Sequence, residues 1–300
     1  MTKGSGQSER IDIMKKITRA VTVVLAASLL LAACAPAAPT PAPAPAPVPA
    51  GAAPEEPADA EPVTIRIGAT SVPHSEILEH IREDLAAEGV LLNIQEFGDF
   101  ALLNPALADG SLDANYFQHI PFMNAFVGNT GNEIVYVVRV HIEPIGLYSQ
   151  DLNYVSQVSE GMSIAIPDDP TNGARALLLL ESLGLLELAD TGANLVSVFD
   201  ITANPLNLNI MEIQAAMLPH TFGDTDLSII NTNFALQAGL NPATDAIARE
   251  NPDSPYANVL AVRPENADDE AIRILARWLT SEKVREFILD QYGGNVVPAF

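Results

Sequence analysis

The stretch from Asp113 to Phe122 combines residue types that could bind a small polar molecule. It reads Asp-Ala-Asn-Tyr-Phe-Gln-His-Ile-Pro-Phe, so rings, amides and an imidazole occur within ten residues. We predict a strand over Leu112–Phe117 that ends before Pro121, because proline cannot donate to a sheet ladder. Rings and hydrogen-bonding groups at a strand end can line a ligand cleft. The stretch alone leaves a second interpretation open, a strand followed by an ordinary loop.

A second candidate site lies in a turn that carries an arginine. Met162–Pro167 reads as a strand, and Asp168-Asp169-Pro170 leads into a helix predicted over Arg175–Leu183. Near the start of a helix, Arg175 and the free backbone N–H groups could bind an anion together. The alternative is a capping turn in which the arginine pairs with an aspartate.

A third polar segment, Asn231-Thr232-Asn233, follows the buried strand predicted over Leu227–Asn231. Its amides offer both donors and acceptors at a strand end. We predict that Asn233 caps the helix that follows, because asparagine is a preferred capping residue.

Strands and helices alternate from residue 64 onward. Thr64–Ala69 and Leu91–Phe97 read as strands, and the apolar spacing from Ile77 to Leu85 predicts a helix between them. Such a crossover unit predicts a parallel sheet. Further predicted elements are the helices Asn104–Ala108, Phe122–Val127 and Ala215–Phe222, the strands Glu133–Val140, Asn209–Ile213 and Val259–Val262, and two amphipathic helices near the C-terminus.

This order predicts an α/β protein with two lobes and a ligand cleft between them. We assign residues 63–145 and 255–300 to lobe I and residues 146–254 to lobe II. Ligands of open α/β sheets lie beyond the carboxyl ends of the strands. Phe117, Asn231 and the turn before Arg175 are expected at such ends.

The first 62 residues read as an export signal and a tether. Basic residues precede the apolar run Ala20–Leu31, which is too short to span a bilayer and is typical of a signal peptide over residues 1–33. Leu31-Ala32-Ala33-Cys34 resembles the lipobox of bacterial lipoproteins, in which the cysteine is lipidated. Cys34 is the single cysteine of the chain, so an intramolecular disulfide is excluded. Residues 34–62 are rich in Ala and Pro and predict an extended linker from the membrane anchor to the folded lobes.

The charge of the chain argues against a nucleic-acid partner. The formal net charge is −23, and removal of residues 1–33 takes away five basic and two acidic residues, which gives −26. A phosphate backbone would repel such a protein, and so would an anionic bilayer. A lipid anchor with a linker is a sensible way to keep this domain near a membrane.

Several segments resemble the methionine-binding substrate lipoproteins of ABC importers, the NlpA type, over about Thr64–Phe300. They are Asp113–Pro121, His141–Pro144, Pro170–Asn172 with Arg175, Ile230–Thr232, and Ser254–Asn258. The resemblance implies a two-lobed periplasmic-binding-protein fold that closes on L-methionine or a close analogue. It also implies delivery to an ABC permease with its ATPase by a monomer that is lipid-anchored on the extracytoplasmic side of the cell membrane. No cofactor and no enzymatic activity are expected.

By position, the resemblance places the ligand pocket on seven residues: Phe100, Phe117, His119, Phe122, Arg175, Asn231 and Asn258. Arg175 would hold the α-carboxylate in a bidentate fork. The two asparagines would fix the α-amino and carboxylate groups. The phenylalanines would surround the thioether sulfur, which contacts aromatic rings favourably, and His119 would complete the polar wall.

The chain departs from the family at two kinds of position. The family often has tyrosine where this chain has Phe100 and Phe122, so the pocket is expected to be more apolar. The turn also has Asp168-Asp169 where Asn-Asp is common, which adds a charge close to Arg175.

Other classes of protein make different demands on the sequence. A metal-binding lipoprotein could use His119, His141 and Glu143 as ligands, and a binding protein for another amino acid would need the same charged anchors. An anchored hydrolase would need a signature such as Gly-x-Ser-x-Gly or His-Glu-x-x-His, which the chain lacks. A surface adhesin would need no pocket of converging Arg and Asn side chains.

Overall fold

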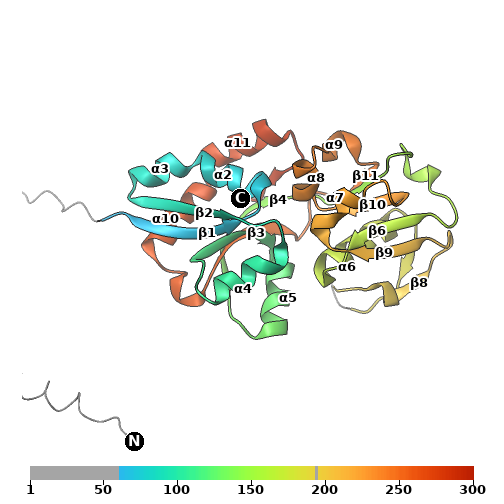
Figure 1. Cartoon of the computed structure of the whole chain (residues 1–300), viewed down its shortest axis with the longest axis horizontal. Coiled ribbons are helices and arrows are strands. Elements are labelled where there is room, and N and C mark those ends of the chain that lie inside the picture. The colour runs from blue at the N-terminus through green and yellow to red at the C-terminus, as the bar shows by residue number, and fades with distance from the viewer. Residues whose placement is uncertain (1–60, 193–194) are drawn as a thin grey trace, which may run out of the picture. The chain divides into compact units, whose positions relative to one another are not determined.

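The computed structural model of the chain describes residues 61–192 and 195–300 (Figure 1). The predicted signal peptide, Cys34 and almost all of the linker lie outside these residues. Within the described ranges, no helix combines the length and the apolarity that crossing a membrane would require.

The first sheet has six strands in the order β13-β4-β12-β3-β1-β2. Their bounds are β1 Val63–Ala69, β2 Val90–Glu96, β3 Ala114–His119, β4 Val135–Ile142, β12 Ala257–Val262 and β13 Val297–Pro298. β1 runs parallel to β2 and β3, as the crossover unit predicts, but β12 runs antiparallel to both β3 and β4. The sheet is therefore mixed rather than parallel, because the chain returns from the second lobe and inserts β12 between β3 and β4.

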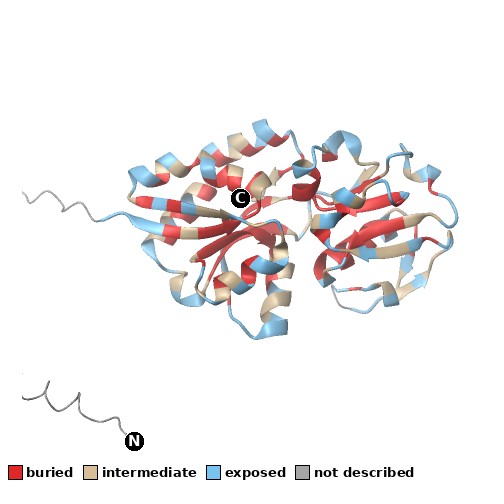
Figure 2. Ribbon diagram, in the orientation of Figure 1, coloured by how far each residue is buried: buried red, intermediate tan, exposed pale blue. Residues whose placement is uncertain are grey.

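Helices pack on both faces of this sheet (Figure 1). They are α2 Glu76–His80, α3 Arg82–Ala87, α4 Leu103–Ala108, α5 Ile120–Thr130, α10 Glu270–Leu279 and α11 Glu282–Tyr292. One core joins β1 and β3 to α2, α10 and α11 through residues such as Ile67, Ile77 and Leu275. A smaller core on α4 and α5 contains Leu107 and Met123. Buried residues follow the central strands in Figure 2.

The second sheet has five strands in the order β11-β5-β10-β6-β9. Its strands are β5 Gly146–Tyr148, β6 Ser163–Pro167, β9 Asn209–Ile213, β10 Leu227–Ile230 and β11 Ala248–Arg249. Its helices are α6 Pro170–Ser182, α7 Leu218–Thr221, α8 Thr232–Gln237 and α9 Pro242–Asp245, and a separate pair is formed by β7 Glu187–Leu188 and β8 Ile201–Ala203. β6 is parallel to β9 and β10, and an apolar cluster that includes Ile164, Leu177 and Ile229 forms the core.

Short turns complete the two lobes. They are the π-helical turn η1 Ser71–Ser75 and the 3-10 turns η2 Phe100–Leu102, η3 Val155–Gln157, η4 Val198–Asp200, η5 Ala215–Met217 and η6 Pro264–Asn266. The strands of the first sheet fall in the segments that we assign to lobe I, and those of the second sheet fall in the segment assigned to lobe II. The lobe boundaries themselves stay a prediction.

Two predicted boundaries are wrong in a way that affects the site. α6 begins at Pro170, five residues before the predicted start, because Pro170 occupies the first turn and Asp169 caps the helix. β3 continues to His119, two residues beyond the predicted end, and α5 begins at Ile120, two residues before the predicted start at Phe122. Arg175 and His119 therefore belong to regular elements, which hold them more rigidly than loops would.

Candidate functional site

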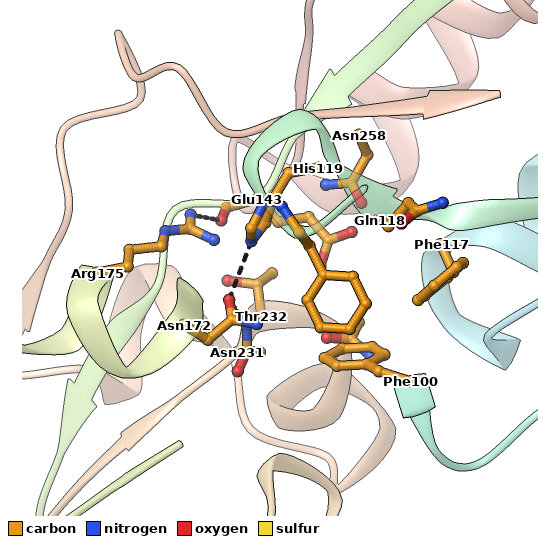
Figure 3. Close-up of a pocket in the computed structure, with 12 residues that line it drawn as sticks. Phe100, Phe117, Gln118, His119, Glu143, Asn172, Arg175, Asn231, Thr232 and Asn258 are labelled. Carbon is orange, nitrogen blue, oxygen red and sulfur yellow. Dashed lines mark hydrogen bonds between the residues drawn. The ribbon is translucent and has the colours of Figure 1, made fainter. Parts of the chain in front are cut away.

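A pocket lies between the two sheets, where residues of both lobes converge. Its twelve lining residues are drawn in Figure 3: Phe100, Phe117, Gln118, His119, Phe122, Glu143, Asn172, Arg175, Asn231, Thr232, Asn233 and Asn258. All seven residues that the sequence predicts for the pocket lie on it. Their contacts with a ligand stay a prediction.

Both lobes supply these side chains from the ends of strands. In the first lobe, β3 ends in Phe117 and His119, and Asn258 lies on the neighbouring β12. In the second lobe, Asn231 follows β10 directly, and Arg175 lies on α6, which follows β6. For β3, β6 and β10 this arrangement agrees with the rule that ligands of α/β sheets bind beyond the carboxyl ends of the strands, whereas Asn258 lies near the amino end of β12, which runs antiparallel to β3.

Three phenylalanines form one side of the pocket, which we call the aromatic wall. The Phe100 ring centroid lies 5.8 Å from that of Phe117 and 6.0 Å from that of Phe122, and the latter two lie 5.8 Å apart. Phe100 also packs 4.7 Å from Phe234. Phe122 meets both other rings edge-to-face, whereas Phe100 and Phe117 are tilted by 39°. An apolar or sulfur-containing chain would fit beside these rings.

Five side chains form the opposite side, which we call the polar wall: Glu143, Asn172, Arg175, Asn231 and Asn258. All five are at least nine-tenths buried. Buried polar groups need partners, so their hydrogen bonds determine which atoms still face the pocket.

Arg175 is held from several directions. Its Nε donates to Glu250 Oε1 at 3.1 Å and Oε2 at 3.0 Å, and its Nη2 donates to Glu250 Oε2 and to the Glu143 main-chain oxygen, both at 2.5 Å. The Tyr256 ring lies 4.4 Å from the guanidinium carbon. The alternative interpretation, in which Arg175 pairs with an aspartate, is therefore wrong, since its carboxylate partner is Glu250. One edge of the guanidinium is already used within the protein.

Asp169 does not face Arg175 but caps α6. Its carboxylate accepts from the backbone N–H groups of Thr171 and Asn172, and from the Asn172 side-chain nitrogen at 2.8 Å. An anion site made from free N–H groups at this helix start is therefore not available, because the cap occupies them. Asp168 lines a separate cavity outside the pocket.

The cap at Asp169 also fixes the orientation of the amides behind it. A carboxylate only accepts, so Asn172 must direct its Nδ2 to Asp169 and its Oδ1 away from it. Asn172 Oδ1 then accepts from Asn231 Nδ2 at 2.9 Å, which leaves Asn231 Oδ1 buried without a partner. Asn231 therefore presents an acceptor to the pocket.

His119 is neutral and uses both ring nitrogens within the protein. Its Nδ1 accepts from the Phe122 backbone N–H at 3.1 Å, so the proton lies on Nε2, which donates to Asn172 Oδ1 at 3.1 Å (Figure 3). Burial, with a smaller contribution from Arg175, lowers the pKa of His119 to about 3. His119 thus lines the pocket as predicted, but it positions Asn172 and offers the pocket mainly its ring surface.

Asn258 and Asn233 present donors. Asn258 Oδ1 accepts from His74 Nε2 at 3.2 Å, which turns its Nδ2 toward other partners. Asn233 lies within α8 and not at its cap, which corrects the prediction for that residue; the capping position belongs to Asn231. The Asn233 Nδ2 is buried without a partner.

A buried cluster of His74, His141 and Glu143 adjoins the pocket, with one ligand atom from each within 4.8 Å of the others. The metal-binding alternative named His119 with His141 and Glu143, so His119 is replaced by His74 in the structure. Both Nε2 atoms point at the same oxygen, Glu143 Oε1, at 2.8 Å from His141 and 3.3 Å from His74. Metal ligands surround a shared centre, whereas these nitrogens converge on the carboxylate as hydrogen-bond donors.

Sequence reasoning missed five residues of the pocket: Gln118, Glu143, Asn172, Thr232 and Asn233. Each lies one or two residues from a predicted contact or inside a segment that carries the resemblance. From its place in the sequence alone, Glu143 fits a salt bridge at the rim of the cleft better than a contact to a ligand amine, but the structure buries it on the pocket. The position of these five residues beside strand ends could have predicted that they line the pocket. The orientation of their side chains could not be predicted, because it depends on partners that are distant in the sequence.

The fold and the pocket define a class of two-lobed proteins that enclose a small molecule between α/β lobes. The chain belongs to the NlpA lipoprotein family, whose model matches residues 65–300. The membrane lipoprotein TpN32 of Treponema pallidum is 37% identical over 237 residues, which cover 79% of this chain and 88% of that relative. The D-methionine-binding lipoprotein MetQ of Escherichia coli is 34% identical over 243 residues, or 80% and 89% of the two chains.

Solved structures agree with this assignment. A nutrient-binding protein from Burkholderia cenocepacia bound to methionine matches with a TM-score of 0.77 and 40% identity, over 79% of this chain and all of that one. The structural likeness confirms the two-lobed periplasmic-binding-protein fold that the resemblance implied.

Proposed function

We propose that this protein binds methionine between its lobes and delivers it to an ABC importer. The single observation that carries the proposal is the division of one buried pocket into two walls. The polar wall offers Arg175 and the Asn258 amide as donors and Asn231 Oδ1 as an acceptor, and the aromatic wall faces it. An α-amino acid with an uncharged, sulfur-containing side chain complements both walls.

The names of the relatives and of the methionine-bound structure support this ligand. The Escherichia coli relative is named for D-methionine, and the Burkholderia structure is described as bound to methionine with no enantiomer stated, so both enantiomers belong in the test.

The proposed partners follow from the family and from the N-terminal sequence. We infer that Cys34 carries the lipid and that the domain works as a monomer on the extracytoplasmic side of the cell membrane. A permease with a cytoplasmic ATPase would receive the methionine. We expect no catalytic step in this chain.

Native mass spectrometry of the full chain in detergent tests the proposal. The protein is measured as purified, and again after partial unfolding and dialysis against L-methionine, D-methionine or L-alanine. We expect one methionine per chain, retained or regained, and no bound alanine. Binding of a divalent metal alone would favour a metal-binding lipoprotein, and the absence of any bound amino acid would overturn the proposal.

A further inference from the structure

Glu143 is a buried carboxylate on the pocket that the predicted ligand contacts leave without a role. It lies between β4 and β5, is 6% exposed, and lines the pocket beside Arg175 (Figure 3). Burying a carboxylate is costly unless hydrogen bonds or charges compensate. Its partners therefore indicate what the site is built to do.

The two imidazoles that contact Glu143 are held as neutral donors. His141 Nδ1 lies 2.5 Å from the Tyr116 hydroxyl, and His74 Nδ1 lies 2.7 Å from Thr70 Oγ1. With each hydroxyl donating to Nδ1, the ring proton lies on Nε2. His141 donates this proton to Glu143 Oε1, and His74 shares its single Nε2–H between Glu143 Oε1 at 3.3 Å and Asn258 Oδ1 at 3.2 Å. Burial lowers the pKa of His74 to about 4 and that of His141 to about 3. Neither ring therefore neutralises the carboxylate at neutral pH.

Arg175 does not neutralise Glu143 by direct contact either. Its Nη2 donates to the main-chain oxygen of Glu143, and its carboxylate partner is Glu250. Among the described residues, the basic side chains within 4 Å of the Glu143 carboxylate are the two neutral histidines. The backbone N–H of Asn233 also donates to this carboxylate. A carboxylate has about four acceptor sites, so three donors leave room for one more.

We propose that Glu143 is the charged acceptor for the α-ammonium group of the ligand. In an α-amino acid, a positive ammonium group and a negative carboxylate are attached to the same carbon. The pocket also places opposite charges side by side, because Arg175 contacts the main chain of Glu143. The partnerless Asn231 Oδ1 is a second acceptor for the ammonium, and the partnerless Asn233 Nδ2 is a further donor for the carboxylate. This inference rests on the proposed function and defines its ligand class, a zwitterionic α-amino acid.

Isothermal calorimetry of the full chain in detergent tests the role of Glu143 with two ligands. L-methionine carries the ammonium, and 4-(methylthio)butanoate has the same thioether and carboxylate but no amino group. In Glu143→Gln we expect the affinity for L-methionine to fall at least about tenfold, since a charge-assisted hydrogen bond is lost. We expect the affinity for 4-(methylthio)butanoate to change by less than about threefold, because that ligand has no group for Glu143 to bind.

Glu250→Gln is the matched comparison, because it removes the other carboxylate near Arg175. Glu250 acts on the ligand through Arg175, so we expect this change to alter the affinities for both ligands by similar factors. Equal losses for both ligands in Glu143→Gln, or no loss for either, would overturn the role of Glu143. If Glu143→Gln does not fold, Glu143→Asp shortens the same side chain, and the same ligand-selective loss is expected.

Different experimental results would overturn the proposed function and the inference about Glu143. A parent protein that binds no methionine would overturn the proposed function. A parent protein that binds methionine, together with equal losses for both ligands in the variant, would overturn only the inference about Glu143. Zinc binding that is lost in Glu143→Gln, without a ligand-selective effect, would also overturn it and would assign the cluster to a metal.

Discussion

The aromatic wall and the polar wall of the pocket differ in how their side chains are held. Phe100, Phe117 and Phe122 contact one another through ring surfaces, with centroids about 6 Å apart. Burial of an apolar ligand chain against these rings is non-directional, so this wall can accept side chains of somewhat different shape. The polar wall is a directed network in which each amide orientation follows from the partner behind it. This difference predicts that the main-chain groups of the ligand are recognised strictly, and its side chain more loosely.

The largest expected effect is on the pH dependence of stability. Buried histidines lie beside and behind the polar wall, whereas the aromatic wall has no group that takes up a proton. The folded-state pKa values of His119 and His141 are about 3 and that of His74 is about 4, below the ordinary value of 6.5. Below pH 6.5 the unfolded chain takes up protons that the folded protein does not. The free energy of unfolding should therefore fall by on the order of 1 kcal/mol per histidine for each pH unit from about 6.5 down to about 4.

Urea denaturation of the full chain at pH 7, 6 and 5 measures this fall. Glu143 acts in the opposite direction, because burial raises the pKa of its carboxyl group and so favours the folded state at low pH. A free energy of unfolding that stays constant from pH 7 to 5 would contradict the neutral, buried state of the three histidines.

Removal of the guanidinium should have the next largest effect. Arg175→Ala should weaken methionine binding at least about a hundredfold, because a buried charged contact commonly contributes a few kcal/mol. Calorimetry measures the loss, and Arg277→Ala serves as the control, since Arg277 pairs with Glu88 at the surface. Unchanged affinity in Arg175→Ala would show that the carboxylate anchor lies elsewhere.

The two walls also differ in how far the sequence predicts them. The resemblance placed seven residues on the pocket, and strand-end positions pointed to three places among them, at Phe117, Asn231 and the turn before Arg175, because strand order is encoded by nearby residues. The partner of Arg175 could not be found this way, since Glu250 lies 75 residues further along the chain. The same holds for His74 and Asn258, which are 184 residues apart. Patterns of nearby residues predict which side chains lie on the pocket. Contacts between distant parts of the chain determine which of their polar atoms are left without a partner and can bind a ligand.

A truncation in the aromatic wall should cost less than the loss of Arg175. Phe100→Ala removes one of three rings, so we expect methionine affinity to fall about tenfold, in line with the area that a ring buries. Phe199→Ala is the matched control, because Phe199 is 94% exposed and lies on η4, away from the pocket residues. Thermal unfolding of each variant separates a loss of affinity from a loss of stability.

The smallest effect is expected where this chain departs from its family. Phe122→Tyr keeps the ring and adds a hydroxyl at a position that borders both the pocket and an outer cavity lined by Asp169 and Thr171. The added group can turn to the outer cavity and bond to water there, so we expect methionine affinity to change by no more than about threefold. Calorimetry with L-methionine and L-leucine measures both affinity and side-chain preference. A gain above about tenfold for methionine alone would mean that the aromatic wall also recognises its ligand through directed hydrogen bonds, and the contrast between the two walls would then disappear.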